Sequence, residues 1–474
     1  MNDPNGLVWL SGTWHLFFQY NPYGADWGNM SWGHAVSDDL ATWQELPPAL
    51  AASDSEAVFS GSVVLDSADT SGLGNGSPPL VAVYTSVAPD GVQAQSLAVS
   101  HDLGGTWTRY PRNPVLDRGS TGFRDPKVFR YQPEGQPGWW VMVAVEATEE
   151  RVLIYRSDDL RRWSEVSEVR ASVAERVLWE CPDLFPLEVE DSPGETAWVL
   201  VVSVNPGGPA GGSGTRYQLG QFDGERFRAA DREGWRWLDY GHDMYAAVSF
   251  AEAPEGRRVV VGWMSNWAYA DAVPTTPWRG AMTLPRELAL ERRADQLTLV
   301  QYVPAEIDVW RADSHAQRRV GALVAGVVDL GRASHARIEL DLEPLGADTL
   351  GLELFAGPMA RTVLSYDVRD QRLTLDRSRS GATDFHPMYA GTPSRARVPL
   401  RSGRLRLVIF LDACSVEVFA DAGAVTITDL VLPEPGADRV ALFTGGGSVR
   451  IHQLDVQLFP GASTSGAVTD VLLA

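Results

Sequence analysis

The sequence predicts an all-β protein in which a five-bladed β-propeller is followed by a β-sandwich. Three observations support this prediction. Runs rich in aromatic and β-branched residues recur along the chain, and the first half shows no convincing amphipathic helix. A polar run that ends on an aromatic residue repeats in the first half at intervals of roughly sixty residues. From about residue 305 this repeat is absent, although alternating strand-like segments continue.

The repeat is clearest in residues 37–43, 100–107 and 157–163, and a weaker copy lies at residues 223–227. The aromatic residues that close the four runs are separated by 64, 56 and 64 positions. A strand-like stretch precedes each run, as residues 14–20 precede the first. Repeats built of several short strands are typical of propeller blades, whereas a sandwich of unrelated strands has no such interval.

Five polar clusters lie in the same phase of this repeat, one for each blade. They are residues 2–6, 59–62, 123–127, 180–183 and 242–245. Successive clusters are 57, 65, 55 and 63 residues apart when counted from Asp3, Ser60, Asp125, Glu180 and Asp243. A single cluster of this kind is usually a turn, because Asp-Pro and Asn-Gly pairs favour turns. Five clusters in register with the repeat instead predict equivalent positions around one axis, and therefore one shared pocket.

The remainder of the chain predicts a second all-β domain. Alternating segments such as residues 336–342 and 405–411 are typical of half-buried strands, and a sandwich of two sheets fits them. We expect the propeller to cover residues 1–304 and the sandwich residues 317–474, with a connector at about 305–316.

Composition excludes several functional classes. The formal net charge of −21 disfavours nucleic acid and anionic membrane surfaces as partners. No apolar run approaches the roughly 20 residues that cross a bilayer. The two cysteines, Cys181 and Cys414, lie far apart, and the histidines show no metal-ligand spacing, so we predict no metal and no cofactor. A neutral sugar is compatible with this composition, whereas the oligomeric state is not predicted.

Three carboxylic acids in the clusters point to glycoside hydrolysis, which needs one ionised and one protonated carboxyl group. Asp3 lies in a turn whose N–H groups are expected to keep it ionised, whereas Glu180 lies between Trp179 and Cys181, a less polar setting that is expected to raise its pKa. Asp125 follows Arg124 and precedes the only lysine, Lys127, by two positions. Either cation is expected to keep Asp125 ionised, as suits binding of sugar hydroxyls or of a developing positive charge.

Aromatic and polar residues near the clusters are candidate contacts for a sugar, because an aromatic face stacks on a sugar ring. Among the 17 tryptophans, Trp27, Trp32, Trp179 and Trp267 fall near the clusters. The predicted substrate contacts are Asn2, Gln19, Trp27, Phe59, Ser60, Arg124 and Trp267.

With the clusters assembled, the chain resembles glycoside hydrolase family 32, which includes invertases, levanases and exo-inulinases. The resemblance rests on three signature motifs, at residues 1–6, 123–126 and 180–183. Further similar segments are residues 18–22, 59–62, 264–267, 276–280, 373–378 and 415–419, so the resemblance extends over nearly the whole chain.

The resemblance implies a five-bladed propeller followed by a β-sandwich, and it implies residue roles. Asp3 would be the nucleophile, Glu180 the acid/base and Asp125 the stabiliser of the transition state. Residues 27–34 and 69–74 are more similar to the levanase and exo-inulinase branch. The expected activity is therefore the release of terminal β-D-fructofuranosyl units from levan, inulin or sucrose, with retention and through a covalent fructosyl-enzyme.

Three alternatives remain open in the sequence. A fructosyltransferase would use the same intermediate but transfer it to a sugar. An arabinan- or xylan-cleaving propeller enzyme would use three acids and invert. A non-catalytic propeller would only bind sugar. The chain as given shows no signal peptide, and an extracellular location is expected if the substrate is a polymeric fructan.

Overall fold

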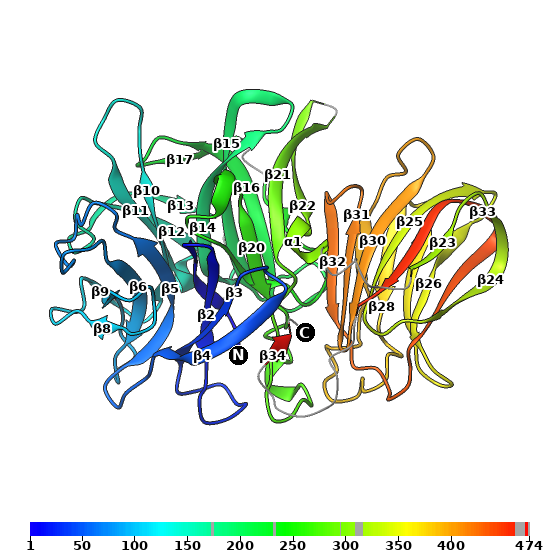
Figure 1. Cartoon of the computed structure of the whole chain (residues 1–474), viewed down its shortest axis with the longest axis horizontal. Coiled ribbons are helices and arrows are strands. Elements are labelled where there is room, and N and C mark those ends of the chain that lie inside the picture. Colours follow the sequence, from blue (N-terminus) through cyan, green and yellow to red (C-terminus); the bar gives the residue numbers. More distant parts are fainter. Residues whose placement is uncertain (172–174, 231–233, 294, 309–315, 460–469, 473–474) are drawn as a thin grey trace.

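The computed structural model describes residues 1–474 except 172–174, 231–233, 294, 309–315, 460–469 and 473–474. Two bodies built of strands lie side by side, the propeller from β1 to β22 and the sandwich from β23 to β33 (Figure 1). This arrangement confirms the predicted fold class. The described helical segments are short: η1 (Ala147–Glu149), η2 (Pro254–Gly256), η3 (Ala270–Ala272) and α1 (Ala305–Asp308). None of the described helices is long and apolar enough to span a membrane.

Blades 1 to 3 are antiparallel sheets that follow one another along the chain. Blade 1 contains β1 (Pro4–Leu10), β2 (Thr13–Tyr20), β3 (Ser31–Ser37) and β4 (Thr42–Leu50), and β34 (Asp470–Leu472) pairs with β4. Blade 2 contains β5 (Ala57–Leu65), β6 (Leu80–Val87) and β7 (Gln93–Ser100), and both β8 (Thr108–Arg109) and β9 (Leu116–Ser120) pair with β7. Blade 3 contains β10 (Phe123–Tyr131), β11 (Trp139–Glu146), β12 (Arg151–Ser157) and β13 (Ser164–Arg170).

Blades 4 and 5 complete the propeller. Blade 4 contains β14 (Leu178–Val189), β15 (Ser192–Asn205) and β16 (Gly214–Phe222), and both β17 (Phe227–Ala229) and β18 (Arg236–Trp237) pair with β16. Blade 5 contains β19 (Tyr245–Ser249), β20 (Val259–Trp263), β21 (Arg286–Arg293) and β22 (Gln296–Tyr302). The first strands of the five blades form a closed ring, because β1 contacts β5 and β19, β10 contacts β5 and β14, and β14 contacts β19. Two hydrogen bonds close the ring between the first and last blades: the N–H of Trp9 donates to the carbonyl of Ala251, and the N–H of Ala251 donates to the carbonyl of Leu7.

The repeated polar run is the turn between the third and fourth strands of a blade. In blade 1 the Oδ1 atom of Asp39 accepts the N–H of Thr42 at 2.6 Å, and the Trp43 indole donates to the carbonyl of Leu40 at 3.1 Å. The Asp-Leu pair therefore shapes a tight turn, in which Leu40 has a φ of 59°. Corresponding contacts are made by Asp102 and Trp107 in blade 2 and by Asp159 and Trp163 in blade 3.

The sandwich is one hydrogen-bonded sheet that folds into two layers. Its strands are β23 (Ala316–Arg319), β24 (Leu323–Arg332), β25 (Ala336–Leu345), β26 (Thr349–Ala356), β27 (Thr362–Asp367), β28 (Arg372–Asp376), β29 (Ser394–Arg397), β30 (Leu405–Asp412), β31 (Ser415–Ala420), β32 (Val425–Leu430) and β33 (Arg439–Leu458). The long strand β33 joins the layers, since its first part pairs with β26 and its second part with β25. Aliphatic side chains from both layers fill one buried core between them.

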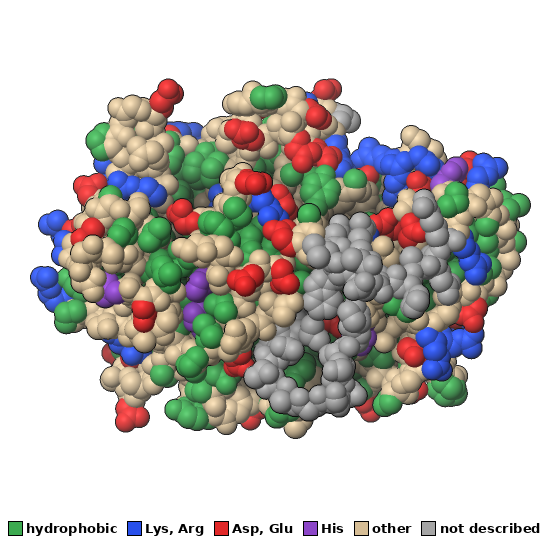
Figure 2. Space-filling view, in the orientation of Figure 1, with side chains coloured by type: hydrophobic (Ala, Val, Ile, Leu, Met, Phe, Trp, Pro, Cys, Tyr) green, Lys and Arg blue, Asp and Glu red, His purple; other side chains and the backbone are tan. Residues whose placement is uncertain are grey.

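The propeller and the sandwich meet through a polar interface. Arg286 of β21 is fully buried there, and its guanidinium binds Asp239 at 2.9 Å and Glu417 of β31 at 2.8 Å. On the face shown in Figure 2, the exposed Asp and Glu side chains are scattered rather than gathered in one patch. Burying ionic groups at this interface is tolerated because each is paired and hydrogen-bonded.

Candidate active site

A β-bulge interrupts the first strand of every blade at the position of its polar cluster. The register against the second strand shifts between Asn5 and Val8, Val58 and Gly61, Arg124 and Lys127, Glu180 and Asp183, and Tyr245 and Val248. A bulge adds a residue to one strand and re-aims the side chains beside it. Asp125, Cys181 and Ala246 each have a positive φ within these bulges. The shared phase of the clusters in the sequence thus corresponds to a shared backbone distortion around the axis.

Asp3 is buried just before β1, where it faces residues of two other blades. Its Oδ2 atom accepts a hydrogen bond from the Ser60 hydroxyl at 3.3 Å and lies 3.7 Å from the Cys181 sulfur. Burial, with the nearby charges of Glu180 and Asp125, raises the pKa of Asp3 from 3.8 to about 7. The expectation that a turn keeps this carboxyl strongly ionised is therefore wrong, because desolvation outweighs the local hydrogen bonds.

Asp125 lies beside Asp3 on β10. Its Oδ2 atom accepts the backbone N–H of Cys181 at 2.9 Å and lies 3.7 Å from the same sulfur, and the Arg124 guanidinium is 3.9 Å away. Burial raises the pKa of Asp125 to about 6 even though Arg124 opposes the shift. Arg124 thus favours the ionised form of Asp125, as expected, but burial has the larger effect on the pKa.

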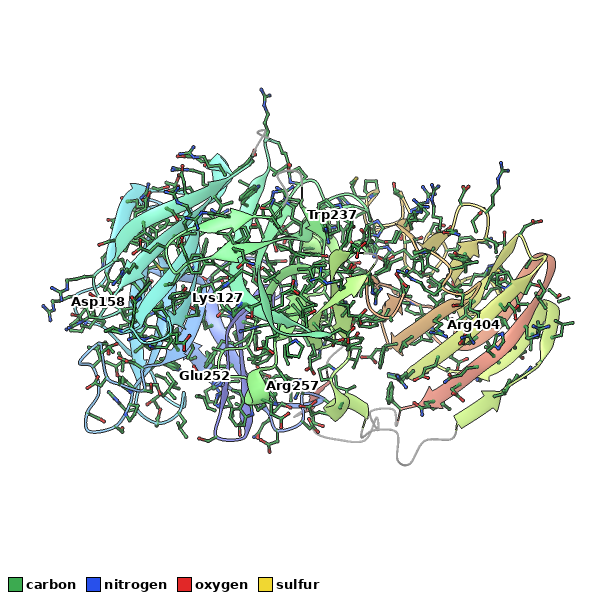
Figure 3. All side chains as sticks on the ribbon, turned by 90° about the horizontal axis from the view of Figure 1, so that it is seen from above. Lys127, Asp158, Trp237, Glu252, Arg257 and Arg404 are labelled. Atoms are coloured by element: carbon green, nitrogen blue, oxygen red, sulfur yellow. The ribbon has the colours of Figure 1, made fainter. Side chains whose placement is uncertain are left out.

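Lys127 does not contact Asp125. Its ammonium group binds Oδ2 of Asp183 on β14 at 3.1 Å and donates to the carbonyl of Ser249 on β19 at 2.5 Å. Lys127 therefore connects three blades in the interior of the propeller, where Figure 3 labels it. The only lysine of the chain is therefore a buried cation that is paired with Asp183 and lines the same small cavity as Asp125.

Glu180 on β14 has a polar environment in place of the apolar one expected from its sequence neighbours. The Arg124 guanidinium donates twice to Oε1, at 3.1 and 3.0 Å, and the Tyr245 hydroxyl donates to Oε2 at 2.5 Å. Trp179 points into the core and is fully buried, so it does not cover the carboxylate. Arg124 and Tyr245 therefore hold the Glu180 carboxylate in one orientation.

Two residues of this group were present in the clusters but had no predicted role. Cys181 lies between Asp3 and Asp125, and burial together with these acids raises the pKa of its thiol well above the ordinary value. Tyr245 contacts Glu180 from the fifth blade. The position of Tyr245 in the fifth cluster, in phase with the acids, is the signal from which its role could have been predicted.

The predicted substrate contacts lie around the same end of the axis. Asn2, Trp27 and Trp267 line one cavity together with Trp263 and Ser265, and Ser60 lines a second with Asp125. Trp27 is 53% exposed and meets Phe59 edge to face, with ring centroids 6.0 Å apart. Gln19 is buried, and its backbone forms hydrogen bonds with the backbone of Asn2 and Asp3. Arg124 binds the Glu180 carboxylate, as described above. Trp32, in contrast, is a core residue whose indole donates to the carbonyl of Phe59.

Several buried donors near this site have no hydrogen-bond partner among the residues that the structure describes. They are the side-chain nitrogens of Gln19, Trp263 and Trp267. An unpaired buried donor costs free energy, about 1–3 kcal/mol, unless a ligand or water satisfies it. These donors and the exposed face of Trp27 fit a ligand that combines hydroxyl groups with an apolar ring face, as a sugar does.

Comparison with known proteins decides the family. The profile described as Glycosyl hydrolases family 32 N-terminal domain matches residues 1–302, and the profile described as Glycosyl hydrolases family 32 C terminal matches residues 308–457. The chain belongs to glycosyl hydrolase family 32. The predicted resemblance is thereby confirmed, and the protein is a glycosidase.

Relatives within family 32 match most of the chain. A levanase of Bacillus subtilis is 42% identical over 96% of this chain and 68% of its own length. An extracellular exo-inulinase of Aspergillus niger is 39% identical over 96% of this chain and 91% of its own length. The crystal structure of exo-inulinase from Aspergillus awamori superposes with a TM-score of 0.90 and 36% identity, covering 97% of this chain and 96% of that one. Fructofuranosidase from Schwanniomyces occidentalis complexed with fructose superposes with a TM-score of 0.88 and 29% identity, covering 96% and 95%.

Proposed function

We propose that this family 32 glycosidase is a retaining exo-β-fructosidase that releases terminal β-D-fructofuranosyl units from levan, inulin or sucrose. The observation that carries the proposal is the meeting of three carboxylic acids from three blades at one end of the axis, with Asp3 and Asp125 on either side of the Cys181 thiol. Glu180 belongs to the same electrostatic group, because its charge acts on both aspartates. Two carboxyl groups with distinct partners are what the retaining mechanism requires.

In the proposed mechanism Asp3 attacks the anomeric carbon of the terminal fructosyl unit while Glu180 gives a proton to the leaving glycosidic oxygen. The bond to the leaving group breaks as the bond to the Asp3 carboxylate forms, which leaves a covalent fructosyl-enzyme. Glu180 then takes a proton from water as the water attacks the same carbon, the bond from this carbon to Asp3 breaks and restores the carboxylate, and fructose leaves with retained configuration. Asp125 stabilises the positive charge that develops on the ring.

The first step needs the proton on Glu180 and the negative charge on Asp3. In the free enzyme, burial raises the pKa of Asp3, so its carboxyl group keeps a proton up to about pH 7. Arg124 and Tyr245 meanwhile donate hydrogen bonds to the Glu180 carboxylate. Asp3 and Asp125 act on each other electrostatically, so their titration belongs to the pair rather than to either residue alone.

The exo mode is supported by relatives that are named exo-inulinases and that match 96% of this chain. Lys127 binds Asp183 and Ser249 across the axis and lines a small cavity together with Ser60 and Asp125. Trp27, Phe59 and Trp267 lie on the outer side, where they would contact the ring of the bound unit or of its neighbour.

The test is a time course of products from sucrose, inulin and levan. We expect free fructose as the first and main product from each active substrate, and loss of release in Asp3→Ala and Glu180→Ala. Short fructo-oligosaccharides as first products would contradict exo action, and longer fructans as main products at high sucrose would indicate a fructosyltransferase. With methanol as acceptor, a methyl β-fructofuranoside is expected, and the α-anomer would contradict retention.

A polymeric substrate implies action outside the cell, and we propose this location for the protein. Support comes from a relative that is named an extracellular exo-inulinase. Detection of the mature protein in the culture medium of its source cells tests the proposal, and retention inside the cells would contradict it.

A further inference from the structure

One arginine of the sandwich is bound into the propeller close to the site. Arg377 follows β28, is 1% exposed, and directs its guanidinium toward blade 5. It donates to Oδ2 of Asp243 at 2.5 Å, to the Tyr269 hydroxyl at 2.7 Å and to the carbonyls of Leu430 and Tyr389 at 2.7 and 2.8 Å. Its charge also lies over the Tyr389 ring, 4.0 Å from the centroid. Four hydrogen bonds and a ring contact fix this side chain in one orientation.

The first propeller partner, Asp243, lies immediately before the strand that reaches Glu180. Asp243 is fully buried, and its carboxylate accepts the N–H of Leu430 at 2.8 Å as well as the Tyr269 hydroxyl. Two residues later Tyr245 begins β19 and donates its hydroxyl to Glu180. The position of the Tyr245 ring therefore depends on where the carboxylate of Asp243 is held.

The second propeller partner, Tyr269, belongs to the segment that forms one wall of the pocket. Trp267, Ala270 and Asp271 of this segment line the cavity with Asn2 and Trp27. The Tyr269 ring instead packs in a separate buried cluster with Tyr389 and Leu430 of the sandwich. The segment thus presents one side to the pocket and is held on the other side by the sandwich.

We propose that Arg377 is a positioning residue for the active site, although it lies in the other domain. It holds Asp243 and Tyr269 together, and so fixes the two propeller segments that carry Tyr245 and Trp267. The inference rests on the proposed function, in which Glu180 is the acid/base. The other fully buried arginine of the interface, Arg286, is bound differently: its ionic partners are Asp239 and Glu417, and it reaches the segment of Tyr245 only at the sulfur of Met244, 3.1 Å away.

The sharpest perturbation removes a single hydroxyl group from this arrangement. Tyr269→Phe deletes the bond to Asp243 and the acceptor for Arg377 but keeps the ring in its cluster. Tyr389→Phe is the matched control, since Tyr389 is equally buried beside the same guanidinium and its hydroxyl donates only to the carbonyl of Leu430, at 3.0 Å. Tyr269→Phe loses two buried hydrogen bonds and Tyr389→Phe loses one, so we expect both variants to have a lower Tm, with the larger decrease in Tyr269→Phe.

The two variants are expected to differ in catalysis. Tyr269→Phe should lower kcat/KM for inulin or levan about tenfold and shift the basic limb of the pH profile, because Tyr245 no longer holds its position against Glu180. Tyr389→Phe should keep the parent kcat/KM and pH profile. Arg377→Lys, which keeps the charge but loses the planar fork, should show the defect of Tyr269→Phe in larger form.

Two outcomes would overturn the inference. One is a parent-like kcat/KM and pH profile in Tyr269→Phe. The other is a loss of activity in both Tyr269→Phe and Tyr389→Phe in proportion to their loss of stability, because a merely structural role predicts this parallel. The proposed function fails separately, if the parent protein releases no fructose or if Asp3→Ala keeps its activity.

Discussion

Replacing the proposed nucleophile is expected to stabilise the protein. Asp3 is buried against Asp125 and Glu180, and its pKa is raised from 3.8 to about 7. The folded form therefore keeps a proton on Asp3 up to about pH 7, whereas the unfolded chain releases it near pH 4. Between these values unfolding releases a proton, so this residue lowers the stability of the fold as the pH rises. Asp3→Asn cannot ionise and removes this loss.

The size of the effect follows from the shift. About three pKa units at 1.36 kcal/mol each set an upper limit of about 4 kcal/mol, reached above pH 7. Coupling to Asp125 and Glu180 reduces the value, so a gain of about 1–3 kcal/mol at pH 8.5 is the working expectation. Near pH 5 the Asp3 carboxyl is already neutral in the folded form, and the advantage of Asp3→Asn should largely disappear.

The assay is urea unfolding of the parent and Asp3→Asn at about pH 5 and pH 8.5. Asp102→Asn is the control of opposite sign, because hydrogen bonds from Thr106 lower the pKa of Asp102 and the substitution should weaken the fold slightly above pH 4. A stability difference for Asp3→Asn that is equal at the two pH values would refute the argument. So would destabilisation at pH 8.5, since it would mean that the charged carboxylate is favoured by its surroundings.

Three further predictions follow from the same contacts. The acid limb of kcat/KM should report an apparent pKa between about 6 and 7, because Asp3 and Asp125 must both be ionised in the free enzyme, and a limb near pH 4 would contradict the effect of burial. Lys127→Met should lower the free energy of unfolding by about 3 kcal/mol, because it leaves the Asp183 charge without its ion-pair partner. The double variant Lys127→Met/Asp183→Asn should recover much of this stability, as measured by chemical unfolding. Trp27→Ala should raise KM for inulin several-fold with a smaller change in kcat, as initial rates would show, whereas an unchanged KM would exclude Trp27 from the bound ring.

The five-bladed architecture was predictable because the blades repeat a local structure. Each copy contains an Asp whose side chain accepts N–H groups of its own turn, and a tryptophan that closes the turn. Both residues are visible in the sequence, and the regular spacing between successive copies indicates one copy for each blade. Asp3, Asp125 and Glu180 were predictable for the same reason, since their common phase places them at equivalent positions in the first strands of their blades, around one axis.

The protonation of the acids was not predictable, because it depends on residues that tertiary structure brings together. The sequence places Trp179 beside Glu180, but the fold turns Trp179 into the core and brings in Tyr245 from another blade. It also places Lys127 two residues from Asp125, but the bulge directs the ammonium to Asp183. In a strand that contains a bulge, simple alternation of side chains predicts the wrong face of the sheet for the residues beyond the bulge. The correct face is known only from the pairing register with the partner strand.

The central claim, that Asp3 is a nucleophile assisted by Glu180, is tested most directly by trapping the covalent intermediate. In Glu180→Gln, β-D-fructofuranosyl fluoride should still react, because fluoride leaves without a proton, but the second step then lacks its base. Mass spectrometry of the quenched protein should show a gain of one fructosyl unit, located on the peptide that contains Asp3 and absent from the doubly substituted Asp3→Asn/Glu180→Gln protein. No adduct while fluoride is released, or an adduct on the peptide that contains Asp125, would contradict the assignment.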